Sequence, residues 1–426
     1  MKDLIIIGGG PGGYVAAIRA RQLGMDVMLV ERDRVGGTCL NRGCIPTKAY
    51  YRNAEVLRDI KRLQDYNIKG PIADLEFDLE GAQQRKNEIV ANLVGGVDKL
   101  LQANRVEVVW GQAHILSSSQ VEVEGNIYNT RRILIAAGSK VLEPPIPGIG
   151  EEGVVTSAEL LEMTSVPSRL LIIGGGVIGM EFAGIFQQFG SQVTVVEAGS
   201  SILGQLDQEL VKRIRVFIRR QGITVYSKTR VERIERQDDH LLVTAVNEKE
   251  EKQLEVDCVL LAVGRQPCTD DINLDKLGIE LENDGIKVDE NYCTSADGIY
   301  AIGDVIGGQM LAHVASEEGK VAVERMCGMN SAVSYHAVPS CIFTFPEIAS
   351  VGLSQEEAAA SGLDYRIGKF QFAANGKAMT LGETDGLVKV IADEKDCIVG
   401  VHIMGPHASD LILEGTLMVR EKMSIE

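Results

Sequence analysis

The apolar positions of the chain form two runs of the same design, one over residues 4–31 and one over residues 170–197. Each begins with four consecutive apolar residues, as a strand buried on both faces would, and continues through a glycine-rich turn into a helical pattern. A second apolar run then ends each copy at a glutamate, Glu31 or Glu197. The pattern predicts two strand–turn–helix–strand units, which align without a gap at Gly8, Gly10 and Gly13 in the first and at Gly174, Gly176 and Gly179 in the second.

A second pair of similar segments follows the two units. Residues 131–138 and 257–264 both read as apolar strands that end in Ala-x-Gly, and each comes after a stretch of alternating pattern, over residues 106–128 and 223–246. Each strand would close the parallel sheet of its own unit. We therefore predict an α/β fold with two Rossmann-like domains, the first near residues 1–145 and an inserted second near residues 146–266.

The glycines of each unit follow the G-x-G-x-x-G pattern of dinucleotide-binding turns. The first glycine permits the tight turn, the second lets a pyrophosphate approach the backbone, and the third lets the helix pack closely on the strand. The helix N-terminus offers amide donors to the phosphates, and the final glutamate accepts a hydrogen bond from a ribose hydroxyl. One such motif can be a close-packed turn without a ligand, but two complete units predict that the chain binds two dinucleotides.

Glu197 indicates which nicotinamide dinucleotide the second unit binds. A carboxylate at this position repels the 2′-phosphate of NADP, and no lysine or arginine follows Glu197 before Lys212. NAD is therefore expected in preference to NADP.

Composition and charge argue against other classes of protein. The 426 residues carry a formal net charge of −17, which disfavours non-specific binding to nucleic acid or to an anionic membrane. The longest apolar stretch, residues 170–186, is interrupted by glycines and contains Glu181, so it does not read as a membrane span. Met1 leads directly into an apolar strand without the pattern of a secretory signal, and a cytoplasmic location is expected.

Two of the eight cysteines, Cys39 and Cys44, stand five residues apart after the first unit. A disulfide between them would need local distortion of a helix, which Gly43 and Pro46 allow. Such a short, strained bridge stabilises little and favours a redox couple. The alternatives are two inert thiols or half of a zinc site, but no second cysteine pair completes such a site and no metal is expected. The other six lack metal-ligand spacing and are expected to be reduced and mostly buried: Cys258, Cys268, Cys293, Cys327, Cys341 and Cys397.

The run GGTCLNRGCIPTK, residues 36–48, resembles the active-site signature of the flavin-dependent pyridine nucleotide–disulfide oxidoreductases. Within this family, the chain most resembles the dihydrolipoyl dehydrogenases, and the resemblance extends over nearly its whole length. It implies FAD in the first domain and NAD in the second. It also implies a central segment at residues 267–335 that completes the FAD domain, and an α+β dimerisation domain at residues 336–426, hence a homodimer.

The resemblance assigns roles to single residues. Cys39 would be the exposed thiol that exchanges with the substrate sulfur, and Cys44 would lie against the flavin. Lys48, one helical turn after Cys44, would stabilise charge on the reduced flavin and pair with Glu181, unless both are ordinary surface charges. The implied FAD contacts are Gly8, Gly10, Gly13, Glu31, Thr38, Lys48, Ala113, Gly138, Gly303, Asp304 and Ala312. The implied NAD contacts are Gly174, Gly176, Gly179, Glu197, Val231, Ala262, Gly264 and Arg265.

The implied reaction is the FAD-dependent oxidation of protein-bound dihydrolipoamide to lipoamide with reduction of NAD, through a Cys39–Cys44 redox disulfide. The partner would be a lipoyl-bearing protein of a 2-oxo acid dehydrogenase or glycine cleavage complex, with no role for nucleic acid or a membrane. Two alternatives stay open. One is a flavin-dependent NADH reductase or transhydrogenase with another acceptor, and the other is an assembly subunit that keeps the fold without turnover.

One segment of the family pattern is missing. Relatives carry a general acid/base histidine in an H-x-H-P-T-x-S-E segment near the C-terminus, whereas this sequence ends at residue 426, before such a segment. None of the six histidines stands in a matching context. We expect the chain to be a truncated version of a longer protein, and the alternative is a natural variant that lost the base. In either case we expect the 426-residue chain to bind FAD and pass electrons from NADH to dyes but to oxidise dihydrolipoamide poorly. Full turnover of dihydrolipoamide by the 426-residue chain would contradict this expectation.

Overall fold

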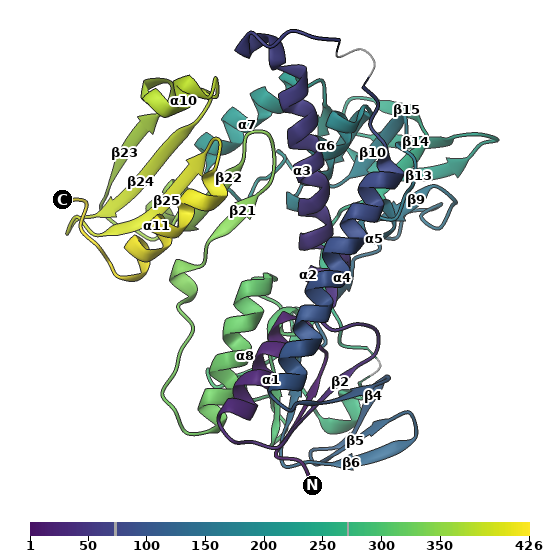
Figure 1. The fold of residues 1–426 in the computed structure, drawn as a ribbon, viewed down its shortest axis with the longest axis vertical. Helices are drawn as coiled ribbons and strands as arrows, with labels where there is room; N and C mark the ends of the chain where they lie inside the picture. Colours follow the sequence, from purple (N-terminus) through teal and green to yellow (C-terminus); the bar gives the residue numbers. More distant parts are fainter. Residues whose placement is uncertain (72–74, 271) are drawn as a thin grey trace. The chain divides into compact units, whose positions relative to one another are not determined.

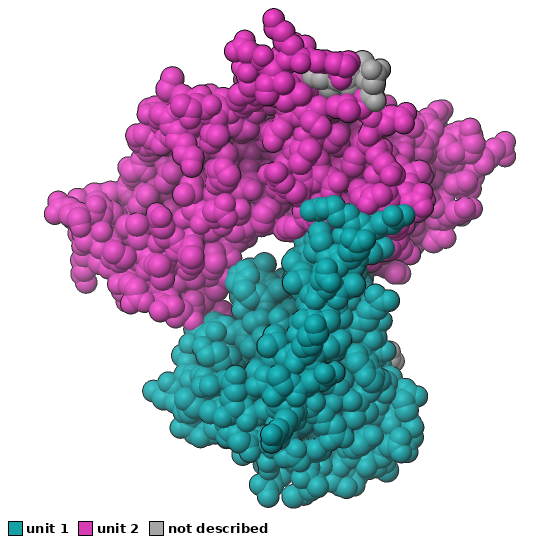
Figure 2. All heavy atoms as spheres, viewed as in Figure 1, with its two compact units in different colours: residues 1–47, 84–142, 264–333 teal, residues 48–83, 143–263, 334–426 magenta. Residues whose placement is uncertain are grey.

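The computed structural model describes residues 1–71, 75–270 and 272–426, and the contacts within the chain divide it into two units (Figure 2). Unit 1 comprises Met1–Thr47, Gln84–Leu142 and Gly264–Val333, and unit 2 comprises Lys48–Gln83, Glu143–Val263 and Ser334–Glu426. Helix α3 (Cys44–Lys61) begins in unit 1 and continues in unit 2, whereas α4 (Leu79–Ala103) begins in unit 2 and continues in unit 1. The domain boundaries drawn from the sequence stay a prediction.

Unit 1 is built on a parallel five-stranded sheet in the order β20-β7-β1-β2-β3. Its strands are β1 (Leu4–Ile7), β2 (Val27–Glu31), β3 (Glu107–Trp110), β7 (Ile133–Ile135) and β20 (Ile299–Ala301), and its helices are α1 (Pro11–Gln22), α2 (Gly37–Arg42) and α8 (Ala312–Met326). The smaller pieces are an antiparallel sheet of β4 (Ala113–Ser117), β5 (Gln120–Val123) and β6 (Asn126–Asn129), the ribbon of β8 (Ser139–Val141) with β17 (Arg265–Pro267), and the hairpin of β18 (Leu281–Glu282) with β19 (Gly285–Ile286).

The central strand β1 is apolar at every position because both faces of the sheet are covered. Leu4 and Ile6 belong to one hydrophobic cluster, and Ile5 and Ile7 belong to another on the opposite face. On one face, α1 and α8 pack against each other so closely that a side chain at Gly319 would come within 2.4 Å of the Gly12 carbonyl oxygen.

Unit 2 repeats this design with a second parallel sheet, in the order β12-β11-β10-β16-β9. Its elements are β9 (Val154–Thr156), α5 (Ser157–Leu160), β10 (Arg169–Ile173), α6 (Val177–Phe189), β11 (Gln192–Glu197), α7 (Gln208–Arg220), β12 (Thr224–Ser227) and β16 (Cys258–Leu261), with an antiparallel sheet of β13 (Arg230–Arg236), β14 (Leu241–Val246) and β15 (Glu251–Val256). Strand β7 lies parallel to β1, and β16 lies parallel to β10. The predicted α/β class with two Rossmann-like sheets is confirmed.

The C-terminal part of unit 2 forms an antiparallel sheet in the order β21-β22-β25-β24-β23, with α11 packed against it (Figure 1). Its elements are β21 (Ser340–Ile342), β22 (Ile348–Gly352), α9 (Gln355–Ala360), β23 (Tyr365–Gln371), α10 (Gly376–Thr380), β24 (Leu387–Asp393), β25 (Ile398–Met404) and α11 (Ala408–Arg420). The α+β class expected for this part is therefore also present.

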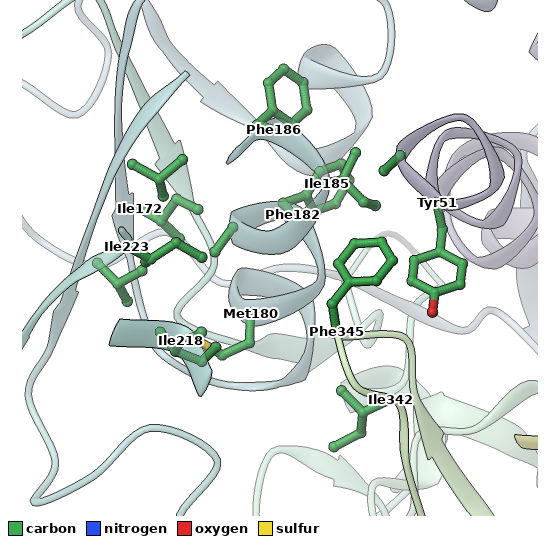
Figure 3. Packing of buried hydrophobic residues seen from close by; sticks show 14 of the residues in the cluster. Tyr51, Ile172, Met180, Phe182, Ile185, Phe186, Ile218, Ile223, Ile342 and Phe345 are labelled. Atoms are coloured by element: carbon green, nitrogen blue, oxygen red, sulfur yellow. The ribbon is translucent and has the colours of Figure 1, made fainter. Parts of the chain in front are cut away.

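The largest hydrophobic cluster lies within unit 2 and joins α6 to α3 and to the segment after β21 (Figure 3). The ring of Tyr51 stacks on Phe345 with 4.8 Å between centroids, and the Tyr51 hydroxyl donates to the Thr344 carbonyl oxygen at 3.3 Å. Phe182 and Ile185 of α6 belong to the same cluster. This packing fixes the position of α3, and therefore of Lys48, within unit 2.

Candidate functional site

The first and third glycines of both motifs occupy positions that a larger residue would not tolerate. Gly8 and Gly174 have φ angles of +104° and +106°, in the region that glycine adopts most readily. A Cβ atom on Gly13 would lie 1.8 Å from the Gly8 carbonyl oxygen, and one on Gly179 would lie 2.0 Å from that of Gly174. The two turns are therefore built alike, and each brings its helix close to its strand.

The second glycine of each motif faces open space. Gly10 and Gly176 are the N-cap residues of α1 and α6, and neither helix start has a hydrogen bond from a capping side chain. A Cβ on Gly176 would meet no described atom within 4 Å, and one on Gly10 would meet only the Cα of Gly37, at 3.8 Å. Backbone amides that a ligand can approach at a helix N-terminus suit a pyrophosphate, so the residues present fit a dinucleotide in each unit.

The two glutamates that end β2 and β11 hold the glycine turns in the same manner. Glu31 accepts a hydrogen bond from the amide of Gly9 at 2.7 Å, and Glu197 accepts one from Gly175 at 2.6 Å. Burial raises the pKa of Glu31, although the Gly9 amide partly opposes that shift. Each carboxylate thus lies beside the turn that would receive a pyrophosphate, where the attached ribose would also lie.

The cysteine segment is fixed to the first glycine turn within unit 1. The amide of Gly36 donates to the Gly9 carbonyl oxygen at 2.8 Å, and a Cβ on Gly37 would lie 2.6 Å from the Cα of Gly10. Cys39 lies in α2, which ends before Gly43, and Cys44 begins α3. The break between the two helices falls at Gly43, one of the two residues expected to allow local distortion of the helix. Both thiols therefore stand close to the place predicted for the flavin dinucleotide.

The exposures of the cysteines correct two expectations. Cys39, expected to be the exposed thiol, is half-buried within α2, whereas Cys44 is exposed because it opens α3. Of the other six, expected to be mostly buried, only Cys258 is buried. Cys258 lies in the central strand β16. The other five lie in an edge strand, at the end of a strand or helix, or in a loop: Cys268, Cys293, Cys327, Cys341 and Cys397. Of these five, Cys327 is exposed and the other four are half-buried.

Lys48 and Glu181 meet within unit 2, although 133 residues separate them in the sequence. The Lys48 ammonium lies 3.2 Å and 3.1 Å from the two carboxylate oxygens of Glu181, whose side chain is only 6% exposed. The Phe343 amide donates to Glu181 at 3.0 Å, and the Phe343 ring centroid lies 4.3 Å from the Lys48 Nζ atom. The pair is thus not made of ordinary surface charges, since the carboxylate is buried and the ammonium is held on two sides.

The remaining flavin-side positions lie in unit 1. Gly303 has a φ angle of +74°, and its amide donates to the buried carboxylate of Glu318 at 2.7 Å. Asp304 follows Gly303 and accepts a hydrogen bond from the hydroxyl of Ser139. Unit 1 therefore contains all of the predicted FAD positions except Lys48: Gly8, Gly10, Gly13, Glu31, Thr38, Ala113, Gly138, Gly303, Asp304 and Ala312.

The predicted NAD positions divide between the units. Val231 is buried in β13. Ala262 lies beside the second glycine turn, since a Cβ on Gly174 would come within 2.3 Å of the Ala262 carbonyl oxygen. Gly264 and Arg265, however, belong to unit 1. Unit 2 holds the others: Gly174, Gly176, Gly179, Glu197, Val231 and Ala262.

Three residues that support the candidate site are not among the positions assigned from the sequence, namely Ser139, Glu318 and Phe343. Ser139 directly follows the assigned Gly138, Glu318 lies in α8, which begins at the assigned Ala312, and Phe343 directly follows β21. Their polar contacts connect segments 15 to 165 residues apart. Only the folded chain shows such contacts.

In residues 1–71, 75–270 and 272–426, no helix combines the length and the apolar character that crossing a bilayer requires. No group of three or more histidine, cysteine or carboxylate side chains in the described residues has the arrangement of a metal site.

Comparison with known proteins places this geometry in a family. Residues 2–319 match the model of the pyridine nucleotide-disulphide oxidoreductases, and residues 338–426 match the model of the dimerisation domain of the same family. The chain belongs to the pyridine nucleotide-disulphide oxidoreductase family. The resemblance seen in residues 36–48 is thereby confirmed.

Three similar proteins illustrate the range of the family. A dihydrolipoyl dehydrogenase of Halobacterium salinarum is 41% identical over an alignment that covers all of this chain and 91% of the relative. A leghemoglobin reductase of Glycine max is 39% identical, over all of this chain and 83% of the relative. A solved structure, an HOCl-induced flavoprotein disulfide reductase of Escherichia coli, superimposes with a TM-score of 0.88 at 31% identity, over 99% of this chain and 94% of the other.

Proposed function

We propose that this chain is an NAD-linked dihydrolipoyl dehydrogenase in which Cys39 and Cys44 form a redox disulfide. The observation that carries the proposal is the attachment of the cysteine segment to the first glycine turn, through Gly36 and Gly37, within unit 1. A pair of thiols built onto a dinucleotide-binding turn favours electron exchange with that dinucleotide over a structural role. The relative of that name in Halobacterium salinarum supports the choice of dihydrolipoamide as the thiol substrate.

The cofactors of the proposal are FAD in unit 1 and NAD in unit 2. FAD, when bound, supplies an acceptor for an electron pair, and NAD supplies an acceptor for a hydride. The helix starts at Gly10 and Gly176 would hold the two pyrophosphates, and Glu31 and Glu197 would accept from ribose hydroxyls. Because Glu197 would repel a 2′-phosphate, we propose NAD and not NADP.

Dihydrolipoamide and the Cys39–Cys44 disulfide are the only reactants that the thiol exchange needs. The two S–H groups of dihydrolipoamide exchange with the Cys39–Cys44 disulfide through a mixed disulfide. The products are the cyclic disulfide of lipoamide and the two thiols of Cys39 and Cys44. In this scheme one sulfur of dihydrolipoamide attacks Cys39 and forms the mixed disulfide, and the electron pair of the broken Cys39–Cys44 bond stays on Cys44, one turn before Lys48 in α3. The second substrate sulfur then closes the disulfide of lipoamide and releases Cys39 as a thiol.

Lys48 and Glu181 are proposed to act as an orienting pair for that chemistry. Glu181 and the Phe343 ring fix the Lys48 ammonium, so its positive charge would stand at one place rather than follow a mobile side chain. A fixed cation favours negative charge that develops on a neighbouring cofactor or thiolate.

The proposed partners are a second copy of this chain and a lipoyl-bearing protein of a 2-oxo acid dehydrogenase or glycine cleavage complex, with a cytoplasmic location. The match of residues 338–426 to a dimerisation domain supports the homodimer. Helix α11 in that segment also exposes Leu413 and Leu417, at 62% and 48%, which a subunit contact would cover.

Anaerobic titration of the FAD-loaded protein with NADH tests the redox disulfide. The wild-type chain should take up about two electron pairs per FAD, one by the flavin and one by the disulfide, whereas Cys39→Ser should take up about one. Cys327→Ser is the matched control, since Cys327 is exposed but lies outside the cysteine segment, and it should titrate like wild type. Uptake of two pairs by Cys39→Ser would contradict the proposal.

A comparison of substrates distinguishes a dihydrolipoyl dehydrogenase from the second candidate function, a flavin-dependent NADH reductase or transhydrogenase with another acceptor. The similarity to a leghemoglobin reductase supports keeping this second candidate. If dihydrolipoamide is the substrate, it should reduce the wild-type protein in a single turnover at least about tenfold faster than reduced glutathione does at equal thiol concentration. Reduction of a dye by NADH that is unchanged by Cys39→Ser, together with no reduction by dihydrolipoamide, would support the second candidate.

A further inference from the structure

Three polar side chains of unit 1 form a continuous hydrogen-bonded relay. The Arg265 guanidinium donates from Nε to the Ser139 hydroxyl oxygen at 2.7 Å and from Nη2 to the Ser139 carbonyl oxygen at 2.6 Å. The Ser139 hydroxyl in turn donates to the Oδ2 atom of Asp304. The Ser139 hydroxyl therefore accepts from a cation and donates to a carboxylate, and each contact strengthens the other.

The backbone that carries Ser139 and Arg265 is a paired ribbon. Strands β8 and β17 are antiparallel, with Arg265 opposite Val141. The ribbon is extended at both ends, because the Leu142 amide donates to the Gly264 carbonyl oxygen at 3.0 Å and the Cys268 amide donates to that of Gly138 at 2.9 Å. The chain leaves unit 1 after one strand of this ribbon and re-enters it at the other. The backbone of Ser139 and Arg265 is therefore held by strand pairing and does not belong to an unpaired loop.

Asp304 is left with one oxygen for a ligand. Its Oδ2 atom is held by Ser139, whereas its Oδ1 atom accepts no hydrogen bond from any residue in the described part of the chain. The backbone before it is also fixed, because the Gly303 amide donates to Glu318. A half-buried carboxylate with one oxygen fixed and the other available suits a hydroxyl donor such as those of a sugar alcohol.

We propose that Arg265 and Ser139 are positioning residues for the flavin, which act through Asp304 on the ribityl hydroxyls of FAD. This inference rests on the proposed function, in which unit 1 binds FAD and Asp304 contacts it. It changes the assignment made from the sequence, where Arg265 was an NAD contact. Lysine does not replace arginine in this role, because only the planar guanidinium reaches both oxygens of Ser139 at once.

The first test compares cofactor affinities of three variants, with the dissociation constant for FAD measured by fluorescence titration of the apoprotein. Arg265→Lys and Ser139→Ala should each raise that constant about tenfold or more, the effect of losing one charge-assisted hydrogen bond. The constant for NAD⁺, measured by calorimetry, should change less than about threefold in both variants. Lys140→Gln is the matched control, since Lys140 lies in the same strand but pairs with exposed Asp270, and its FAD constant should stay within about twofold of wild type.

The second test asks whether the residues act as one unit. The double variant of Arg265→Lys with Ser139→Ala should bind FAD no more than about twofold more weakly than Ser139→Ala alone, because both substitutions break the same relay. Ser139→Thr, which keeps the hydroxyl in a strand position, should restore most of the affinity. In wild type, FAD should slow amide exchange at residues 138–142 and 264–268, and Ser139→Ala should lose most of that protection.

The outcomes separate the relay from the proposed function. If wild type binds no FAD, the proposed function fails and the relay fails with it. If wild type binds FAD but Ser139→Ala binds it equally well, only the relay is overturned. An Arg265→Lys variant that loses NAD⁺ affinity and keeps FAD affinity would return Arg265 to the NAD site. Far-UV circular dichroism of each apoprotein shows whether a variant folds. If Ser139→Ala does not fold, the FAD dissociation constant of Ser139→Thr still tests the relay.

Discussion

Replacement of Lys389 by methionine should destabilise unit 2 by about 3–5 kcal/mol, the usual cost of leaving one charge of a buried pair without its partner. Lys389 in β24 has no exposed surface, and its ammonium lies 2.6 Å from Asp207 and 2.8 Å from the Gln355 side-chain oxygen. Asp207 also caps α7, since it accepts from the Glu209 amide at 3.0 Å. The substitution therefore strands a buried carboxylate and disturbs a helix start. Urea denaturation followed by circular dichroism measures the loss.

Two further variants make this prediction specific to the buried pair. Lys369→Met removes an exposed lysine of the same sheet that lies 2.7 Å from Glu209, and it should cost less than about 1 kcal/mol. Lys389→Met combined with Asp207→Asn removes both charges, and it should recover part of the stability lost in the single variant. A loss in Lys389→Met no larger than that in Lys369→Met would contradict the prediction.

The same pair gives the stability of unit 2 a dependence on pH. Burial alone raises the pKa of Asp207, but the hydrogen bonds from Lys389 and the Gln355 amide, together with the charge of Lys389, outweigh it and hold that pKa below its ordinary value of 3.8. A group with a depressed folded-state pKa stabilises the protein fully above its unfolded pKa and loses that contribution as pH falls through the folded value. The stability gap between wild type and Lys389→Met should therefore be largest near neutral pH and narrow below about pH 4.

The sequence predicted those parts of the fold that depend on local pattern. Strands β1 and β10 read as continuous apolar runs because both faces of their sheets are covered, one by helices and the other by a small antiparallel sheet, and the repeated glycines marked the turns after them. Glu181 drew attention because a charge is rare within an apolar run, and its pairing with Lys48 followed from the family resemblance.

The contacts that escaped prediction join side chains far apart in the chain. Ser139 meets Asp304 across 165 residues, and Lys389 meets Asp207 across 182. No local pattern specifies such a partner, although the alternating pattern of β24 already places Lys389 on the inward face. Lys389 alternates with half-buried neighbours and shares its buried face with Leu387 and Ile391, so it occupies an inward position where an unpaired charge would not be stable.

The two glycine turns should respond to the same substitution with opposite losses of cofactor. In Gly13→Ala the new methyl group would lie 1.8 Å from the Gly8 carbonyl oxygen, and in Gly179→Ala it would lie 2.0 Å from that of Gly174. Each turn must shift to relieve the clash, at about 1–3 kcal/mol of stability, and the shift displaces the amides that face a pyrophosphate. We expect Gly13→Ala to weaken FAD binding at least about tenfold with little effect on NAD⁺, and Gly179→Ala to do the reverse.

Calorimetric titration of each apoprotein with FAD and with NAD⁺ measures this reciprocal pattern, and Gly95→Ala supplies the control. Gly95 lies inside helix α4, where an added Cβ meets no described atom within 4 Å, so alanine should leave both affinities unchanged and stabilise the helix by up to about 1 kcal/mol. Loss of both cofactors in either turn variant, with the fold intact, would mean that the two turns do not serve separate dinucleotides. Loss of FAD alone in Gly13→Ala, matched by loss of NAD⁺ alone in Gly179→Ala, would instead assign one dinucleotide to each copy of the duplicated unit, because the substitutions are chemically identical and differ only in the turn that they disturb.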